Sequence, residues 1–190
     1  MRDNISRAFD SVSSVEMLEG LRWYEQAKMA VEKTIAIPYS LSLEAAVGVV
    51  AVLSPGCGWR QNLDDAAWLM ANPNTNMPVA SYKSNVRKAL RIHAGENPSE
   101  VLRGRKVIAF AHNLLYPESS PFVTIDRHAV RVALNRNVGA SAGSRLLDRS
   151  GVYDRFSEAY TLAAERVGIL GLQMQASVWI SYRNKLGINS

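Results

Sequence analysis

Two residues of opposite charge, Lys106 and Asp126, stand twenty positions apart (126 − 106), and each lies at the predicted start of a helix. A lysine can act as an amine nucleophile, and a nearby carboxylate can accept its proton or stabilise a cation on a sugar carbon. Together, the two groups could cut an N-glycosidic bond in DNA. Both types also have ordinary roles, because aspartate is a preferred N-cap and lysine is common in an exposed first turn.

The segments around this pair are predicted to bring the two side chains together. Apolar residues recur three, four and seven positions after Val107, which predicts a helix from about residue 106 to 115, about 15 Å long. The connection over residues 116–125 contains Pro117 and Pro121 and could extend to about 33 Å. A connection of that length can return to the start of the first helix. The two helix N-termini would then lie side by side and could hold a phosphate.

The rest of the chain also predicts helices, and no segment alternates convincingly as a strand does. Residues 43–53 are apolar nearly all round, which predicts a buried helix capped by Ser42. The small residues 139–143 predict a loop. The other predicted helices cover residues 1–37, 63–71 (capped by Asn62), 82–94, 153–167 and 172–186. The fold class is therefore expected to be all-α.

Composition limits the kinds of protein this chain can be. Its 190 residues suit one domain or two interlocked lobes, and an apolar fraction of 47% is enough for a core. The net charge of +5 suits a polyanionic partner, although it also describes an ordinary basic protein. The single cysteine, Cys57, excludes an internal disulfide and a four-cysteine cluster. We expect no metal and no cofactor.

The sequence also predicts a location. No apolar run approaches the roughly 20 residues that span a bilayer, and no apolar segment typical of a signal peptide follows Met1. We therefore expect no membrane partner and a cytoplasmic protein, either associated with a nucleoid or in a host cytoplasm if the chain is phage-encoded.

Residues 40–137 resemble the helix-hairpin-helix (HhH-GPD) DNA glycosylases of the endonuclease III type, without their iron–sulfur cluster. The resemblance is carried by the run Leu102–Lys106, the buried helix after it, and the run Ile125–Val132. It implies a compact two-lobed helical bundle with a helix-hairpin-helix element, DNA-glycosylase-like, forming one domain over residues 1–190. The helices within 1–37 and 153–186 would complete the second lobe.

The resemblance also implies roles for particular residues. Lys106 stands in the place of the lysine that attacks the sugar C1′ of a flipped-out nucleotide and forms a Schiff base. Asp126 stands in the place of the aspartate that activates that amine or a water and supports the cationic sugar. Gly104 matches the hairpin glycine whose N–H faces a DNA phosphate, and Arg103 and Arg105 flank it.

Further DNA contacts are expected on both sides of this hairpin. The loop 54–61 falls where the family inserts a side chain into the gap left by the flipped base. The expected contacts are Trp59, Arg60, Gln61, Lys83, Arg127 and His128. Trp59 could equally be a partly buried anchor, and His128 a packed or capping histidine.

The implied function is excision of a damaged or modified base from double-stranded DNA with a flipped nucleotide. Three alternatives stay open. The chain could be a non-catalytic DNA-binding module, which is favoured by Leu102 standing where the family has glycine. It could be an enzyme that processes hypermodified bases in phage DNA. It could also be a helical interaction protein in which Lys106 and Asp126 are solvated charges. The sequence does not predict an oligomeric state.

Overall fold

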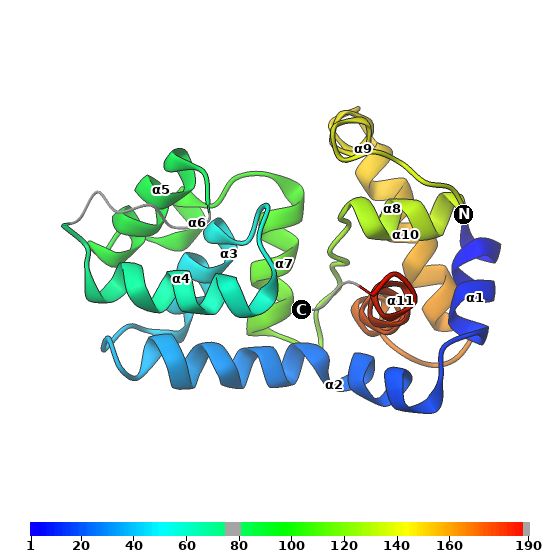
Figure 1. The fold of residues 1–190 in the computed structure, drawn as a ribbon, viewed down its shortest axis with the longest axis horizontal. Coiled ribbons are helices and arrows are strands. Elements are labelled where there is room, and N and C mark those ends of the chain that lie inside the picture. The colour runs from blue at the N-terminus through cyan, green and yellow to red at the C-terminus, as the bar shows by residue number, and fades with distance from the viewer. Residues whose placement is uncertain (75–80, 188–190) are drawn as a thin grey trace. The chain divides into compact units, whose positions relative to one another are not determined.

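The computed structural model describes residues 1–74 and 81–187. Over these residues the protein is all-α, as predicted: it contains eleven α-helices, one short π-helix and no strand (Figure 1). The elements are α1 (Arg2–Asp10), α2 (Ser14–Val31), the π-helix η1 (Glu32–Ala36), α3 (Leu43–Leu53), α4 (Trp59–Ala71), α5 (Lys83–His93), α6 (Pro98–Val101), α7 (Arg105–Leu115), α8 (Arg127–Leu134), α9 (Ala140–Leu147), α10 (Val152–Glu165) and α11 (Gly171–Lys185).

The helices form two compact units. Unit 1 contains Met1–Tyr24 and the described residues from Tyr116 onward, and therefore α1, the first part of α2, and α8 to α11. Unit 2 contains Glu25–Leu115, and therefore the rest of α2, η1, and α3 to α7. Each unit has a buried interior of its own.

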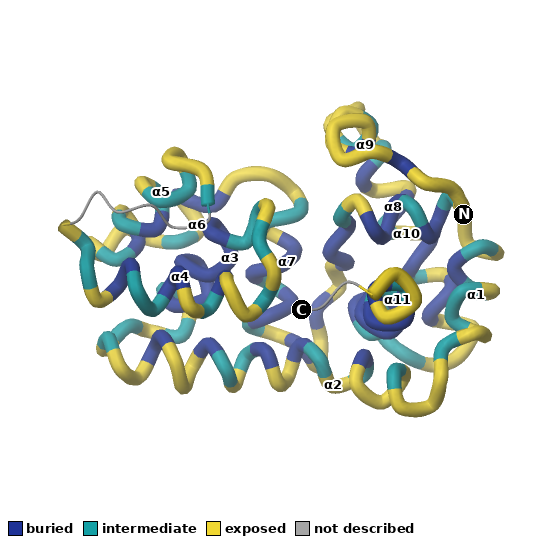
Figure 2. The backbone as a smooth tube through the Cα atoms, in the orientation of Figure 1, coloured by how far each residue is buried: buried dark blue, intermediate teal, exposed yellow. Residues whose placement is uncertain are grey.

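Helix α3 is the centre of unit 2, and most of it is buried (Figure 2). It packs against α4, α5, α6, α7 and η1, which explains why it is apolar on every side. The Ser42 hydroxyl accepts a hydrogen bond from Ala45 N at 3.1 Å, so the predicted helix and its cap are both confirmed. A Cβ on Gly48 would lie 3.0 Å from Cβ of Pro98, which shows how closely α3 approaches the start of α6.

Helix α11 is the central helix of unit 1, where it packs against α1, α8 and α10. Two tyrosines of α10 hold the segment that leads into α8. The Tyr153 hydroxyl donates to Val123 O and accepts from Ile125 N, both at 3.0 Å. The buried Tyr160 hydroxyl donates to Ala129 O at 3.0 Å. These bonds fix the backbone on both sides of Asp126.

Three sequence predictions were wrong in detail. The first helix breaks at residues 11–13, between α1 and α2, and η1 follows α2 before Pro38. The predicted cap Asn62 lies inside α4, which already begins after Gly58. Asn62 is buried and donates to Val50 O at 3.0 Å, tying α4 to α3. Residues 139–143 are not a loop: Gly139 is the N-cap of α9 and the helix begins at Ala140, and a Cβ on Gly143 would lie 3.6 Å from Cβ of Arg127.

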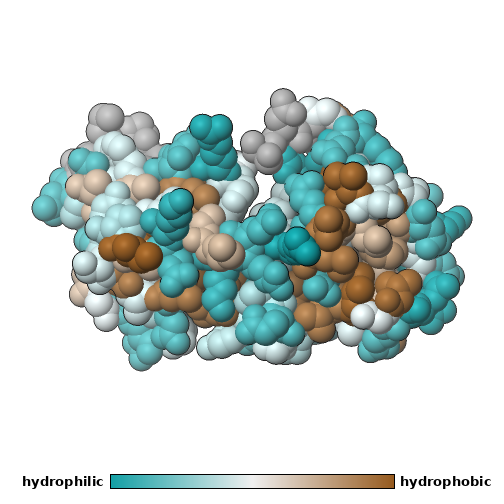
Figure 3. Space-filling model, turned by 90° about the horizontal axis from the view of Figure 1, so that it is seen from below, coloured by the Kyte–Doolittle hydropathy of each residue, from teal (hydrophilic) through white to brown (hydrophobic). Residues whose placement is uncertain are grey.

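Several large apolar side chains of unit 1 are exposed, among them Val15, Leu18 and Val167. Figure 3 shows apolar side chains gathered on one face of this unit, at the right, with polar side chains between them. No helix within residues 1–74 and 81–187 is long and apolar enough to span a bilayer.

Candidate functional site

Lys106 lies in the first turn of α7, immediately after a tight turn. Leu102, Arg103 and Gly104 connect α6 to α7. Gly104 has a φ of +86°, a left-handed conformation that favours glycine. Its carbonyl oxygen accepts from Ile108 N at 3.1 Å, which starts the helix. The predicted helix start is confirmed, and it leaves the Lys106 side chain half-buried.

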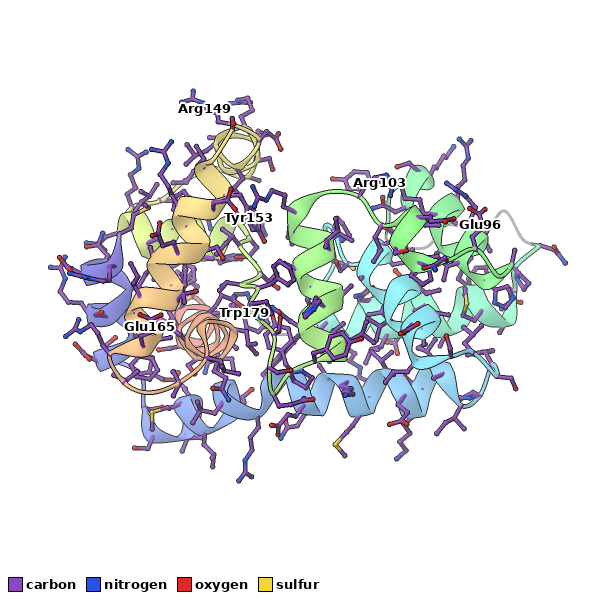
Figure 4. The ribbon with its side chains drawn as sticks, turned by 180° about the vertical axis from the view of Figure 1, so that it is seen from behind. Glu96, Arg103, Arg149, Tyr153, Glu165 and Trp179 are labelled. Atoms are coloured by element: carbon purple, nitrogen blue, oxygen red, sulfur yellow. The ribbon has the colours of Figure 1, made fainter. Side chains whose placement is uncertain are left out.

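The turn before α7 presents positive charge to solvent. Arg103, Gly104 and Arg105 are all exposed, and Arg103 Nη1 donates to Leu102 O at 2.7 Å (Figure 4). Leu102 itself has an ordinary extended backbone, with φ −61°, and a buried side chain. The chain therefore uses this position for packing.

The Cys57 thiol of unit 2 is close enough to Asp65 and to Lys106 for both charges to affect its pKa. Burial raises the pKa of the Cys57 thiol, the charge of Asp65 raises it further, and the charge of Lys106 lowers it. Asp65 is buried, and its Oδ1 accepts from Gln61 Nε2 at 2.7 Å. Lys106 thus lies in a polar part of unit 2 that holds both a thiol and a carboxylate.

The residues expected in the loop 54–61 lie partly in a helix. Trp59, Arg60 and Gln61 form the first turn of α4, so their assignment to a loop was wrong: the helix begins after Gly58. The Trp59 ring is half-buried and stands edge-on to Phe110 of α7, with centroids 6.4 Å apart, as an anchor would. Arg60 and Gln61 are exposed. Lys83 is exposed as well, at the first position of α5.

Asp126 caps α8 in unit 1. Its Oδ1 accepts from His128 N at 2.9 Å and from Ala129 N at 2.8 Å, so the capping role that the sequence allowed is confirmed. Both bonds use the same oxygen. The other carboxylate oxygen makes no hydrogen bond within the described part of the chain, so the half-buried Asp126 retains an oxygen that a ligand could use.

A buried cation lies within the electrostatic reach of this carboxylate. Burial lowers the pKa of the Arg183 guanidinium, and the charges of Asp126 and Glu19 oppose that effect. The guanidinium lies over the Trp179 ring, 4.3 Å from its centroid. Burial, and then the charge of Asp126, raises the pKa of Tyr160.

His128 is buried in the first turn of α8. Burial lowers the pKa of its imidazole, Asp126 opposes this, and three neighbouring arginines lower it further. Its Nε2 accepts a hydrogen bond from Arg127 Nε at 3.2 Å. Its Nδ1 is buried and has no hydrogen-bond partner among the residues that the structure describes. His128 is thus a packed histidine, one of the roles that the sequence allowed. The neighbouring Arg127 is exposed.

A family model matches residues 1–186 of this chain. The chain belongs to DUF7178, a family of unknown function. No curated protein and no solved structure matches it. The function of this DUF7178 chain is therefore argued from its own residues.

The structure gathers the expected site residues into two sets. Unit 2 holds Lys106 with the exposed turn before α7 and the first turn of α4, and unit 1 holds Asp126 with Arg127 and His128. The approach of Lys106 to Asp126 stays a prediction. Within the described ranges no group of three or more His, Cys, Asp or Glu side chains could hold a metal ion.

Three residues near these sets, Arg183, Cys57 and Asp65, were not expected from the sequence. Arg183 gave a signal, because it is the first charged residue after the uncharged run 171–182. The pairing of Cys57 with Asp65 gave none, since it depends on how α4 packs in unit 2.

Proposed function

We propose that this chain is a DNA glycosylase-like enzyme. It would flip a damaged or modified base out of duplex DNA and cut its N-glycosidic bond, with an associated lyase activity through Lys106. The observation that carries the proposal is that Lys106 and Asp126 both stand at the start of a helix. The positive end of the helix dipole at each of these starts suits the phosphates beside a flipped nucleotide.

The segment from α6 to α7 supports the proposal as a helix-hairpin-helix element. Gly104 provides the left-handed turn, its N–H would face a phosphate, and the exposed Arg103 and Arg105 would add charge-assisted contacts. The side chains of Arg60 and Lys83 are both exposed. They would contact phosphates of the same DNA strand or of its complementary strand.

The proposed chemistry uses one base and one nucleophile. Asp126 takes a proton from the Lys106 ammonium, and the amine nitrogen bonds to the sugar C1′. The C1′–N bond to the base breaks, its electron pair leaves with the base, and the base takes a proton from solvent. The C1′–O4′ bond of the sugar then opens: its electron pair goes to O4′, which takes a proton, and the lysine nitrogen gives up one proton and forms the protonated C1′=N Schiff base that borohydride reduces. In the version without a lysine adduct, Asp126 takes the proton of a water that attacks C1′. In both versions the carboxylate lies near the cationic sugar.

One observation favours a second function, a DNA-binding module without catalysis. Leu102 is buried at the position where the hairpin of endonuclease III-type glycosylases has glycine. One close approach of the backbone to a phosphate would therefore be lost. The bonds that Asp126 makes as an N-cap also explain its presence without chemistry. This second function requires that DNA binding persists while substitution of Asp126 by asparagine changes nothing measurable.

The deciding experiment is an activity screen on duplexes that carry diverse damaged and hypermodified bases, with borohydride added to trap enzyme–DNA adducts. We expect the unmutated protein to give an adduct and Lys106→Gln to give none. Lys33→Gln is the matched control, because Lys33 is an exposed lysine of unit 2 outside the expected site, and it should give as much adduct as the unmutated protein.

Asp126→Asn tests the other half of the pair. Asparagine caps a helix about as well as aspartate, so the variant removes the negative charge and preserves the fold. We expect excision to fall by at least the 10²-fold or so that a positioned acid–base group contributes, with DNA affinity nearly unchanged. Salt-dependent DNA binding without excision of any base tested would establish the binding module instead.

A further inference from the structure

A pocket of about 470 Å³ opens in unit 1 at the C-terminal end of α8. Its walls come from α1, from the end of α8 and the residues after it, and from α11. Asn4 of α1 donates through Nδ2 to Ala133 O at 2.9 Å, which holds α1 against α8. Asn135 ends α8 in a left-handed conformation, with φ +49°, and the chain turns there so that Arg136 follows at the pocket.

The pocket is strongly positive. Arg7, Arg131 and Arg136 line it, and no carboxylate is among its described lining residues. Two of the guanidinium groups are held in place by the protein. Arg131 Nε donates to Val138 O at 2.7 Å, and Arg7 Nη2 donates to Asn4 Oδ1 at 2.6 Å. These bonds use only part of the N–H groups of each guanidinium, so both side chains retain further donors for an anion.

The end of α8 does not cancel this charge. A helix C-terminus carries roughly half a negative charge on its unpaired carbonyl groups, against three guanidinium cations here. Those carbonyls are also occupied: Arg131 O accepts from Arg136 N, Val132 O from Asn135 N, and Ala133 O from Asn4 Nδ2. The pocket thus has donors for an anion, and three of the last carbonyl groups of α8 already have partners.

One wall of the pocket is aromatic. Tyr182 of α11 lines it and is half-buried, and its ring centroid lies 5.7 Å from that of the buried His128. A tyrosine ring that lines a pocket can provide a surface on which a nucleobase stacks. The volume falls within the roughly 300–1,000 Å³ that is typical of small-ligand pockets.

We infer that this pocket binds a nucleoside 5′-phosphate, with its phosphate on Arg7, Arg131 and Arg136 and its base against Tyr182. The nucleotide could be free or could be the phosphorylated 5′ end of a DNA strand. The two sources share the chemistry that the pocket recognises. The site goes beyond the proposed glycosylase activity, because neither Lys106 nor Asp126 lines it.

The test is calorimetric titration of the full chain with dAMP and, separately, with inorganic phosphate. The dAMP should bind more tightly than phosphate, and Arg136→Gln should weaken dAMP about tenfold, the loss of one charge-assisted contact. The Arg136 side chain is exposed and makes no hydrogen bond within the described ranges, so this variant should fold normally. Arg149→Gln removes an equally exposed arginine of unit 1 that lies outside the pocket, and it should leave dAMP binding unchanged (Figure 4).

Tyr182→Leu tests the aromatic wall, and it should remove the preference for dAMP over inorganic phosphate. A 5′-phosphorylated oligonucleotide that binds more tightly than dAMP, and more tightly than its unphosphorylated form, would identify the ligand as a strand end. The opposite order would identify it as a free nucleotide. No dAMP binding at millimolar concentration, or binding that Arg136→Gln does not weaken, would overturn the inference. Lys106→Gln and Asp126→Asn should both retain dAMP binding, which separates this result from the fate of the glycosylase proposal.

Discussion

Asp126 combines a capping role with a proposed catalytic one, and the two roles respond differently to substitution. Asp126→Ala removes the acceptor for the N–H groups of His128 and Ala129. We therefore expect the free energy of unfolding to fall by about 1 kcal/mol. Asp126→Asn keeps an acceptor oxygen and should cost only a few tenths of a kcal/mol by the same reasoning. Urea denaturation followed by circular dichroism measures both.

The matched control for this pair is Asp64→Ala. Asp64 is an exposed residue inside α4, where alanine is the better helix former, so this variant should not lose stability. If Asp126→Ala were as stable as the unmutated protein, the cap would contribute nothing in solution. An excision defect of Asp126→Asn could then not be separated from a local change at the start of α8.

At the level of elements, the approach of α2 to α11 in unit 1 depends on a single glycine. An added Cβ at Gly20 would lie 2.3 Å from Cα of Ser177, and a backbone atom cannot move aside as a flexible side chain can. We expect Gly20→Ala to destabilise unit 1 by at least about 3 kcal/mol, measured as a lower Tm.

Gly143→Ala provides the contrast, because that glycine lies inside α9 and a Cβ there would meet only ordinary contacts at 3.6 Å and beyond. It should raise stability by about 0.5–1 kcal/mol. Equal effects of the two variants would contradict the close packing.

The same elements show which parts of the fold could be predicted from the sequence. Helix α3 could be, because an apolar run behind a serine cap has one stable outcome, burial on all sides. The start of α8 could be predicted for a similar local reason. Helix α9 could not, since its small residues are poor local signals and Gly143 is buried by contact with Arg127. Asn62 was assigned to the wrong role because its partner, Val50 O, belongs to another helix.

The candidate site divides in the same way. Lys106 and Asp126 were found because each stands at a helix start that the local pattern defines. Arg183 and the pocket beside Tyr182 depend on how α1, α8 and α11 pack together. Contacts between distant segments leave no periodic signal in the chain, so the basic pocket became visible only in the folded unit.

On the scale of the whole molecule, the proposed enzyme needs both units. Lys106 and the exposed Arg103 and Arg105 belong to unit 2. Asp126, Arg127 and the basic pocket belong to unit 1. In the proposed DNA complex, both units would therefore contribute cations, in a chain whose net charge is +5. Binding should therefore be sensitive to salt for the molecule as a whole, and each cation that contacts a phosphate should contribute separately to that sensitivity.

This salt dependence gives the last prediction. The logarithm of the DNA association constant should fall linearly with the logarithm of salt concentration, by about 0.9 for each phosphate contact. Arg103→Gln should make the slope shallower by about 0.9, because Arg103 is exposed at the proposed hairpin and would lose one contact. Fluorescence anisotropy with a labelled duplex at several salt concentrations measures the slope, and Lys33→Gln should leave it unchanged. If Arg103→Gln and Lys33→Gln change the slope equally, DNA affinity depends only on the net charge of the protein. The turn before α7 would then have no special place on the DNA, and the helix-hairpin-helix assignment would fail with it.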